Sequence, residues 1–548
     1  MTTPHMAPCS ALRSIRQQAR SDLRRAVAAL GLAVIVAFIS SACTTPRAEV
    51  PGPPSEAWPH PGETTLGRGF AEQLVLHPGQ SGIYPLASGM EAFTIRASLA
   101  ESAERTLDLQ YYIVHEDATT QLLLYRVLHA AHRGVRVRLL IDDLDALDKE
   151  FDLATFSAHP NIEVRVFNPF SSRGALGLSH ILEFLGSSER LNHRMHNKLW
   201  IADNAVAIVG GRNLGDEYFD ASGEVNFSDL DILAAGPVVP DISRSFDDYW
   251  NSEWAVPIEA LAGAPPAPTQ LAEFERALQA RLEGFRDTDY ARVLRETRLG
   301  LQLRSGQLPL IAARASALYD PPAKISDSGA ETTPKQVFAS RLRPILESAQ
   351  GEVILVSPYF IPSEEGVAGL TALARRGVRV RILTNSLAST DYVPLAHAGY
   401  ARWRLRLLAA GLELYETRPE PRDATSSRAP GASSSAYLHT KAIVVDRQHV
   451  VVGSMNLDPR SRRSDTQVAV LLESAQLGAR LGALFDDAAR PARAFRVSRA
   501  GPPGEPAQLV WITEEAGKEV RYEQEPLAGF WRRLLSKLLG TFAPEELL

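Results

Sequence analysis

Cysteine is almost absent from this chain: its 548 residues include only Cys9 and Cys43. Two cysteines cannot form a disulfide scaffold or a four-cysteine zinc site. Lysine is also scarce, because only seven of the 58 basic residues are lysines. The formal charge of −6 argues against a general nucleic-acid binder, although a local basic cleft is compatible with it. With 45% hydrophobic and 22% charged residues, the chain is not collagen-like, mostly disordered or a polytopic membrane protein.

The N-terminal region has the layout of a secretory signal. Five arginines and one acid in residues 1–25 precede the charge-free run Ala26–Ala42, which ends at Cys43. Because the segment Ile39–Cys43 resembles a bacterial lipobox, we predict that residues 1–42 are a lipoprotein signal peptide and that Cys43 is lipidated. The alternative is an uncleaved anchor helix, although this run spans only about 25 Å of a bilayer core of ~30 Å.

Either reading places the protein in the bacterial cell envelope, held by lipid and facing the periplasm. Residues 43–74, rich in Pro, Ser and Thr as far as Gly62, are predicted to be a flexible stalk.

Three segments recur in the same order at nearly constant spacing. Residues 133–140 (RGVRVRLL) return as 376–383 (RGVRVRIL), and residues 196–203 (HNKLWIAD) return as 439–446 (HTKAIVVD), both with an offset of 243. An ESA triplet precedes an apolar run in each copy, with an offset of 246. We therefore predict a tandem duplication of one domain, within a length that suits two to four ordinary domains.

Each copy alternates strand and helix patterns, which favours an α/β fold with a mixed β-sheet flanked by helices. Each copy then has two short apolar runs joined by a turn, which is typical of a β-hairpin. The expected strands are 107–113, 135–141, 353–359 and 378–383, the helices 121–133 and 364–376, and the hairpins 199–209 and 442–452.

These patterns divide the chain into lobes and connections. We predict a first lobe at 75–260, a linker and helical segment at 261–335, a second lobe at 336–500 and a C-terminal tail at 501–548. The Pro/Ser/Arg-rich segment Pro419–Ser435 is expected to be a loop over a site.

The hairpins carry the pattern H-x-K-x4-D-x6-G-[GS]-x-N. Histidine and lysine two residues apart on a strand project from the same face, and the glycine turn can bring the asparagine amide beside them. Imidazole, ammonium and amide groups, doubled by the repeat, suit a tetrahedral anion, and two histidines supply a nucleophile and a proton donor for phosphodiester exchange. The residues are His196, Lys198, Asp203, Gly210, Gly211 and Asn213, then His439, Lys441, Asp446, Gly453, Ser454 and Asn456.

The aspartates of the pattern are assigned a structural role, and two alternative interpretations of the whole pattern, surface residues and a zinc site, are disfavoured. Asp203 and Asp446 lie at an odd offset from the lysines, at the hairpin turn, so we read them as structural. A single H-x-K on a strand usually consists of exposed residues without a function. Its duplication with the same Gly and Asn at the same spacing argues against that interpretation. Zinc is a poor alternative, because no Cys or carboxylate ligands cluster with the pattern; we predict no metal and no cofactor.

The paired pattern resembles the two HKD motifs of the phospholipase D superfamily, over residues 75–500, and most closely its C-type bacterial cardiolipin synthases. Segments 76–86, 194–219, 226–233 and 385–404 also resemble this family. The resemblance implies two lobes related by a pseudo-twofold axis, with one shared active site. It also counts Asp203 and Asp446 as catalytic, with His196, Lys198, His439 and Lys441.

The resemblance further implies that His196 forms a phosphohistidine and that His439 is the acid and base, although the sequence alone leaves the two interchangeable. Lys198, Lys441, Asn213 and Asn456 are expected to bind the phosphate oxygens.

In this superfamily a downstream carboxylate orients each histidine. Asp229 fits this place in the first copy, with Asp231 as the alternative and a polar strand edge as the structural reading. In the second copy Gln467 stands where related synthases have an acid, so we expect Asp465 to orient His439 instead. If neither Gln467 nor Asp465 orients His439, we expect a lower turnover rate.

The C-terminal tail is expected to contain a basic amphipathic helix, either on an anionic lipid surface or docked on the protein's own core. Its apolar positions are Phe530, Trp531, Leu534, Leu535, Leu538 and Leu539, with Arg532, Arg533 and Lys537 between them.

The resemblance implies a membrane-associated phosphatidyltransferase that makes cardiolipin from phosphatidylglycerol, with phosphatidylethanolamine as donor. The expected partners are phospholipid substrates and a membrane, with no nucleic acid. The alternatives are a phospholipase D or another phosphodiesterase, such as a nuclease, and a non-enzymatic scaffold. A nuclease would favour a basic cleft, and the complete motifs in both copies argue against a scaffold.

Overall fold

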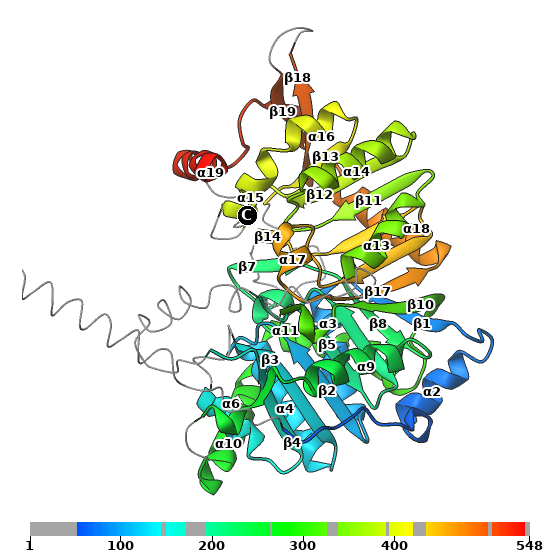
Figure 1. The fold of residues 1–548 in the computed structure, drawn as a ribbon. Helices are drawn as coiled ribbons and strands as arrows, with labels where there is room; N and C mark the ends of the chain where they lie inside the picture. The colour runs from blue at the N-terminus through cyan, green and yellow to red at the C-terminus, as the bar shows by residue number, and fades with distance from the viewer. Residues whose placement is uncertain are drawn as a thin grey trace, which may run out of the picture. The chain divides into compact units, whose positions relative to one another are not determined.

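The computed structural model describes residues 52–143, 150–170, 193–262, 266–325, 338–390, 394–419, 435–501 and 507–542 (Figure 1). Apart from Phe170, these residues belong to one unit, 50–169 and 189–548. The predicted signal peptide, Cys43 and most of the 419–435 segment lie outside the described residues. In the part of the chain that is described, no helix has the length and apolar content needed to cross a bilayer.

The sheet confirms the duplication, because the strands of both copies pair in the same order. The three central strands of each copy are parallel and the outer pairings are antiparallel. The first copy runs β9 (Ala255–Pro257), β4 (Ile162–Phe167), β3 (Arg136–Asp142), β2 (Thr106–Tyr111), β5 (Leu199–Ala202), β6 (Val206–Gly210), β8 (Asp231–Ala235) and β1 (Ser81–Leu86). The second runs β18 (Ala494–Ala500), β13 (Glu413–Thr417), β12 (Arg379–Asn385), β11 (Glu352–Val356), β15 (Ala442–Val445), β16 (His449–Gly453), β17 (Val468–Glu473) and β10 (Ile311–Tyr319).

Strand β10 joins the two copies and corrects the predicted linker. It pairs with β1 through Ile311 and Ile83, and with β17 through Tyr319 and Val468. The helical prediction holds for α10 (Pro268–Arg286), α11 (Asp289–Glu296) and α12 (Leu299–Arg304), but the sheet of the second lobe begins at 311, not after 336. Strand β10 reads IAARASALY, and its four alanines, one serine and one arginine gave only a weak hydrophobic signal. Ile83, Ile311 and Val470 share one hydrophobic cluster, so the two lobes have a common core.

The repeated RGVRV segments end a helix and begin a strand. Helices α4 (Ala118–His132) and α14 (Glu364–Arg375) start at side-chain caps from Asp117 and Ser363. Each ends before a glycine in the left-handed region, Gly134 with φ of 93° and Gly377 with φ of 88°. Glycine adopts this conformation without the strain that a Cβ adds, which explains why both copies place it here.

The remaining helices cover the sheet (Figure 1). They are α3 (Gly89–Ser102), α6 (Glu150–Ser157) and α9 (Val239–Trp250) in the first lobe, and α13 (Phe338–Glu347), α15 (Leu395–Ala401), α16 (Arg404–Ala409), α17 (Pro459–Arg463) and α18 (Ala475–Ala488) in the second.

The predicted stalk is wrong for residues 52–74, which pack on the first lobe. Helix α2 (Thr65–Gln73) buries Leu66 and Phe70, one turn apart, in the core. Upstream, the backbone oxygen of Pro53 accepts a hydrogen bond from Arg165, and the Ala57 amide donates to Asp247. The backbone of this segment therefore binds polar side chains of the first lobe.

The predicted tail is also shorter than expected. Strands β19 (Gln508–Glu515) and β20 (Lys518–Tyr522) extend the second sheet beyond β18. The predicted C-terminal helix is confirmed as α19 (Phe530–Phe542), which contacts α15.

Candidate active site

Each H-x-K segment is bonded to the backbone of the opposite copy. The His196 amide donates to the Thr466 carbonyl (3.1 Å), and the Thr466 amide donates to the Arg194 carbonyl (2.9 Å). In the other direction, the His439 amide donates to the Ser228 carbonyl (2.8 Å). This follows from the parallel pairing of β7 (Val225–Ser228) with β14 (Ser435–Leu438), which leads directly into His439. The two motifs therefore form one site from both copies.

The side-chain partners of the histidines are crossed in the same way. His439 Nδ1 lies 2.6 Å from Asp229 Oδ2, and His196 Nδ1 lies 3.1 Å from Gln467 Oε1. Asp229 thus orients the histidine of the second copy, not that of its own copy. Sequence spacing cannot show this exchange, because it depends on how the two lobes face each other.

The expected role of Asp465 at His439 is wrong. Its carboxylate accepts hydrogen bonds from Arg460 Nε (3.1 Å) and the Arg194 amide (3.3 Å), and so holds the chain that precedes His196. The alternative residue Asp231 pairs with Arg96 and Arg212 in the core of the first lobe.

The two histidines have different electrostatic surroundings. Burial, together with the charges of Lys198 and Lys441, lowers the pKa of the His196 imidazole well below its ordinary value. Because the Gln467 oxygen only accepts, Nδ1 of His196 carries the proton and Nε2 keeps a lone pair. His439 instead has a carboxylate partner, which stabilises its protonated form. Burial opposes ionisation of Asp229, but His439, Lys441 and Arg212 hold the pKa of its carboxyl below the ordinary value.

The two lysines place buried positive charge beside the histidines. Lys198 Nζ donates to the His196 carbonyl (2.7 Å), and Lys441 Nζ donates to the His439 carbonyl (2.6 Å), so the copies match. Burial and the charge of Lys441 lower the pKa of the Lys198 ammonium well below its ordinary value. A bound anion would relieve this repulsion, so the site is suited to a phosphate group.

Aromatic rings that the sequence analysis missed form the walls. The Tyr112 ring centre lies 5.0 Å from that of His196, and Lys198 Nζ lies 5.0 Å from the same ring. Around His439, the ring centres of Tyr218 and Phe227 lie at 5.3 Å and 5.1 Å. Phe227, two residues before Asp229, and Tyr218, just after the first motif, were close enough in sequence to be considered.

The motif asparagines are both buried near the glycine turns. Asn213 Oδ1 accepts from the Ile113 amide (3.2 Å), and Nδ2 donates to the Tyr218 hydroxyl (2.9 Å), which fixes the amide of the first copy. For Asn456, Oδ1 has no hydrogen-bond partner among the described residues. The two amides are therefore not equivalent in this structure, and their binding of phosphate stays a prediction.

The motif aspartates lie at the far ends of the hairpins, in agreement with the structural reading. Asp203 accepts from the amides of Glu104, Arg105 and Thr106, and Asp446 makes the same three bonds to residues 350–352. Asp203 lies five positions after Lys198, which is about 16 Å along an extended strand. Both aspartates adopt positive φ, as a two-residue hairpin turn requires. This geometry does not support the catalytic role that the resemblance implied.

The second residue of each glycine turn, Gly211 or Ser454, explains why the first copy has Asp229 where the second has Gln467. A Cβ on Gly211 would lie 2.6 Å from both carboxylate oxygens of Asp229, so the carboxylate fits only beside glycine. The equivalent Ser454 instead donates its hydroxyl to Gln467 Oε1 (2.7 Å). The first copy thus combines Gly211 with Asp229, and the second copy combines Ser454 with Gln467.

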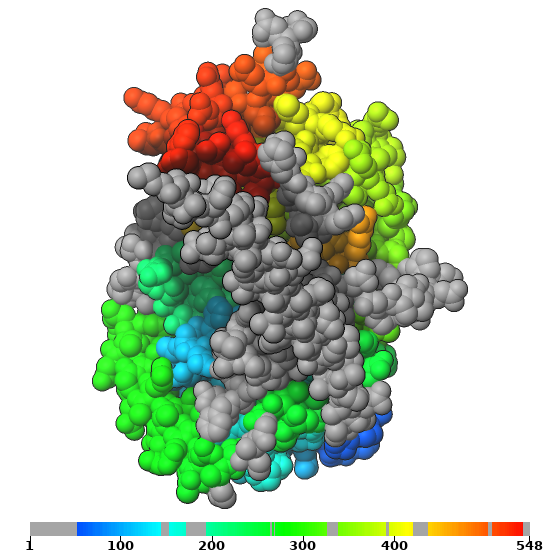
Figure 2. All heavy atoms as spheres, turned by 60° about the vertical axis from the view of Figure 1, so that its left-hand side comes forward, coloured from blue at the N-terminus to red at the C-terminus, as the bar shows by residue number. Residues whose placement is uncertain are grey.

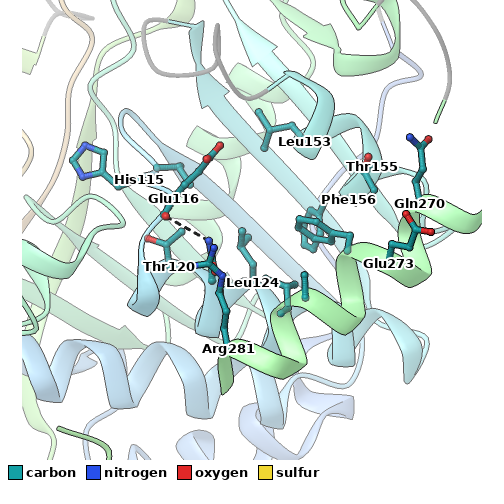
Figure 3. Close-up of a pocket in the computed structure, with 15 residues that line it drawn as sticks. His115, Glu116, Thr120, Leu124, Leu153, Thr155, Phe156, Gln270, Glu273 and Arg281 are labelled. Atoms are coloured by element: carbon teal, nitrogen blue, oxygen red, sulfur yellow. Dashed lines mark hydrogen bonds between the residues drawn. The ribbon is translucent and has the colours of Figure 1, made fainter. Parts of the chain in front are cut away.

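Two other features do not include the motif residues. Among the described residues, His115, Asp117 and Glu217 bring ligand atoms within 4.8 Å of one another, but Asp117 caps α4 and His115 Nδ1 pairs with Glu217 (2.9 Å). A cavity of about 390 Å³ lies among α4, α6 and α10, with His115 at one side and Phe156, Gln270 and Glu273 at the other (Figure 3). Neither motif histidine lines it.

The chain resembles known proteins over nearly its whole length. The family model described as "Cardiolipin synthase, PLD-like domain" matches residues 97–250 and 342–488. The chain is 39% identical to cardiolipin synthase C of Escherichia coli (strain K12) over 480 residues, which cover 86% of this chain and 97% of that protein. It is 30% identical to an uncharacterized protein of Helicobacter pylori (strain J99), covering 94% and 99% of the two chains.

Among solved structures, phosphatidylserine synthase of Haemophilus influenzae Rd KW20 shares the fold. The TM-score is 0.52 at 15% identity, over 87% of this chain and 97% of that chain. The likeness supports the two-lobed α/β architecture.

Substituting Gly211 with alanine tests the pairing of Asp229 with His439. The added Cβ should displace the carboxylate, lengthen the 2.6 Å contact and reduce phosphodiester turnover by about tenfold or more. The matched control is Ser454→Ala, which keeps its Cβ and removes the hydroxyl that donates to Gln467 and accepts from the Val468 amide. Crystal structures and rates of both variants measure the effect. An unchanged His439–Asp229 distance with full activity in Gly211→Ala would contradict the prediction.

Proposed function

We propose that this chain, which belongs to the cardiolipin synthase family of phospholipase D-like (PLD-like) domain proteins, transfers a phosphatidyl group between phospholipids. Phosphatidylglycerol accepts the group and becomes cardiolipin. Phosphatidylethanolamine donates it and releases ethanolamine. The similarity to cardiolipin synthase C supports the product, and the resemblance to C-type synthases supports the donor.

One observation carries the mechanism: a buried histidine with a neutral partner shares the site with a histidine that has a carboxylate partner. A nucleophile must be unprotonated, and a general acid must hold a proton and be able to return it. His196, beside Gln467, suits the first role. His439, beside Asp229, suits the second.

In the first step, His196 Nε2 attacks the phosphorus of the donor. The bond from phosphorus to the head-group oxygen breaks, and His439 protonates the departing alkoxide. In the second step, a hydroxyl of phosphatidylglycerol gives its proton to His439, and its oxygen attacks phosphorus. The phosphorus–nitrogen bond then breaks and returns His196 to its starting form. Lys198 and Lys441 balance the negative charge on the phosphoryl oxygens in both steps.

The proposal includes attachment to a membrane, because both substrates are bilayer lipids. Lipidation of Cys43 after removal of residues 1–42, with the lobes facing the periplasm, is the form of attachment that the N-terminal sequence favours.

Lipid mass analysis tests the reaction. Purified protein incubated with isotopically labelled phosphatidylethanolamine and phosphatidylglycerol should yield cardiolipin that carries the donor's phosphatidyl label, together with free ethanolamine. His196→Asn should yield neither, because no covalent intermediate can form. Phosphatidic acid as the sole labelled product would show that water is the acceptor and that the enzyme is a hydrolase.

Rapid quenching tests the roles of the histidines. With phosphorus-labelled donor, the label should appear on His196 in an acid-labile, base-stable form. His439→Asn should slow its formation by about 10²–10⁴-fold, the usual effect of losing a general acid. Label on His439 would reverse the roles, and the absence of labelled histidine together with loss of turnover in chelators would reject the mechanism.

The substitution Gln467→Glu tests the electrostatics of the nucleophile. Because the pKa of His196 is lowered, activity should decline only well into the acid range, as His196 takes up a proton. A carboxylate at 467 would favour the imidazolium, raise this pKa and move the acid decline of kcat/KM to higher pH. Pre-steady-state rates from about pH 5 to 8 measure the shift, with Ser454→Ala as control. A decline at unchanged or lower pH would contradict this account.

A further inference from the structure

Helix α19 contacts the second lobe through its small and polar residues. Ala528 and Ser536 are buried, with 6% and 7% exposure, and Gly540 lies against Ala398 of α15. Arg532 donates a hydrogen bond to the Thr390 carbonyl (2.6 Å). Arg532, Ser536 and Gly540 recur every four residues on the helix, so they form one stripe that faces the protein, and Ala528 lies just before the helix begins.

The apolar stripe of the same helix faces away from the protein. At about 100° per residue its members from Phe530 to Leu538 fall within an arc of about 140°, opposite the docked stripe, and Leu527 lies in the turn just before the helix. A surface helix ordinarily turns its apolar stripe to the core, so α19 is inverted. The exposed fractions are Leu527 55%, Phe530 67%, Trp531 76%, Leu534 38%, Leu535 47% and Leu538 48%, which we call the α19 apolar face.

This clustering is unusual within the molecule. The other strongly exposed large apolar residues of the described chain are Val75, Leu76, Leu301, Leu405 and Leu484, which lie on separate elements apart from the pair 75–76. A contiguous apolar patch of this kind marks an interaction surface. The red C-terminal segment forms part of the molecular surface in Figure 2.

The positive charge of α19 indicates which kind of surface its apolar face binds. Helix α19 contains Arg532, Arg533 and Lys537 and no acidic residue, although the whole chain carries a net charge of −6. On the helix, Arg533 and Lys537 border one edge of the apolar face and Arg532 borders the other. Apolar residues flanked by basic ones, with Phe530 and Trp531 at one end, suit the head-group boundary of an anionic bilayer.

The α19 apolar face is connected to the active site through one short path. Arg532 binds Thr390, five residues after Asn385 at the end of β12. Both the amide and the carbonyl of Leu438 bond to the Asn385 side chain, at 3.1 Å and 2.9 Å, and His439 follows Leu438. In Figure 1, α19 lies beside α15 on the same side of the second lobe as β14.

We propose that the α19 apolar face docks on the surface of an anionic phospholipid bilayer and holds the shared site there. The inference rests on the proposed function, since substrates that reside in a bilayer are the reason to choose lipid as the occupant.

Site-specific fluorescence tests the docking. The full chain with Cys9→Ser and Cys43→Ser carries an environment-sensitive dye at Leu535→Cys or, as the matched control, at Leu484→Cys, whose exposure of 43% is similar. With vesicles of phosphatidylcholine and phosphatidylglycerol, the dye at 535 should shift to the blue and be quenched by acyl-brominated lipid, whereas the dye at 484 should not. The response should weaken with phosphatidylcholine alone and in Arg533→Gln/Lys537→Gln. An equal response at both positions would overturn the proposal. So would a dye at 535 that is already shielded before lipid is added, because another part of the protein or a second copy would then cover the face.

An activity comparison separates docking from chemistry. Trp531→Ser/Leu535→Ser should lose about tenfold or more of its activity on vesicles, which corresponds to about 1.4 kcal/mol of lost surface binding. It should keep full activity on detergent-dispersed substrate, and Leu301→Ser/Leu484→Ser should keep both activities. Equal loss in both assays, or none, would overturn the role of the face. Wild-type protein that shows the dye response without transferring lipid would overturn the proposed function and leave the docking intact.

Discussion

The exchange of hydrogen bonds between the two copies is the constraint on which the site depends. His196 is bonded to Thr466 and Gln467, and His439 to Ser228 and Asp229, so neither histidine is oriented by its own copy. Such an arrangement requires the lobes to keep a fixed register. The pairing of β1 with β10 and the shared hydrophobic core supply that register, because a slip by one residue would turn every inward side chain of a strand outward.

The crossed pairing also allows the two copies to differ. A carboxylate at both histidines would place two negative charges against Lys198 and Lys441, whereas Gln467 leaves only Asp229. With His196 neutral and His439 protonated, Lys198, Lys441, His439 and Asp229 carry a net positive charge that a phosphodiester monoanion partly offsets. Each sequence difference then has a local reason: Gly211 makes room for Asp229, and Ser454 gives Gln467 a hydrogen bond.

Sequence patterns identified what depends on neighbours along the chain. The helices before Gly134 and Gly377 and the two hairpins were predictable, because caps, turns and apolar periodicity are local signals. The motif side chains were found because the duplication repeats them. The predictions that were wrong concern contacts between distant segments. Strand β10 forms because β1 and β17 pair with it on either side. Residues 52–74 bind Arg165 and Asp247 of the first lobe, and Asp229 binds the histidine of the opposite copy, His439.

The burial of the site explains why docking matters energetically. His196, Lys198 and Lys441 are buried, with 8%, 2% and 3% exposure, so a substrate phosphate must enter the protein while its acyl chains stay in an apolar phase. Moving a chain into water costs about 0.8 kcal/mol for each CH₂, which for two full-length chains far exceeds what a few hydrogen bonds to phosphate return. A head group can therefore reach the lysines only if the entrance lies at the bilayer surface. Helix α19 is linked through Thr390 and Asn385 to the segment that ends at His439, so the proposed contact of its apolar face with lipid would also position the histidines relative to the bilayer.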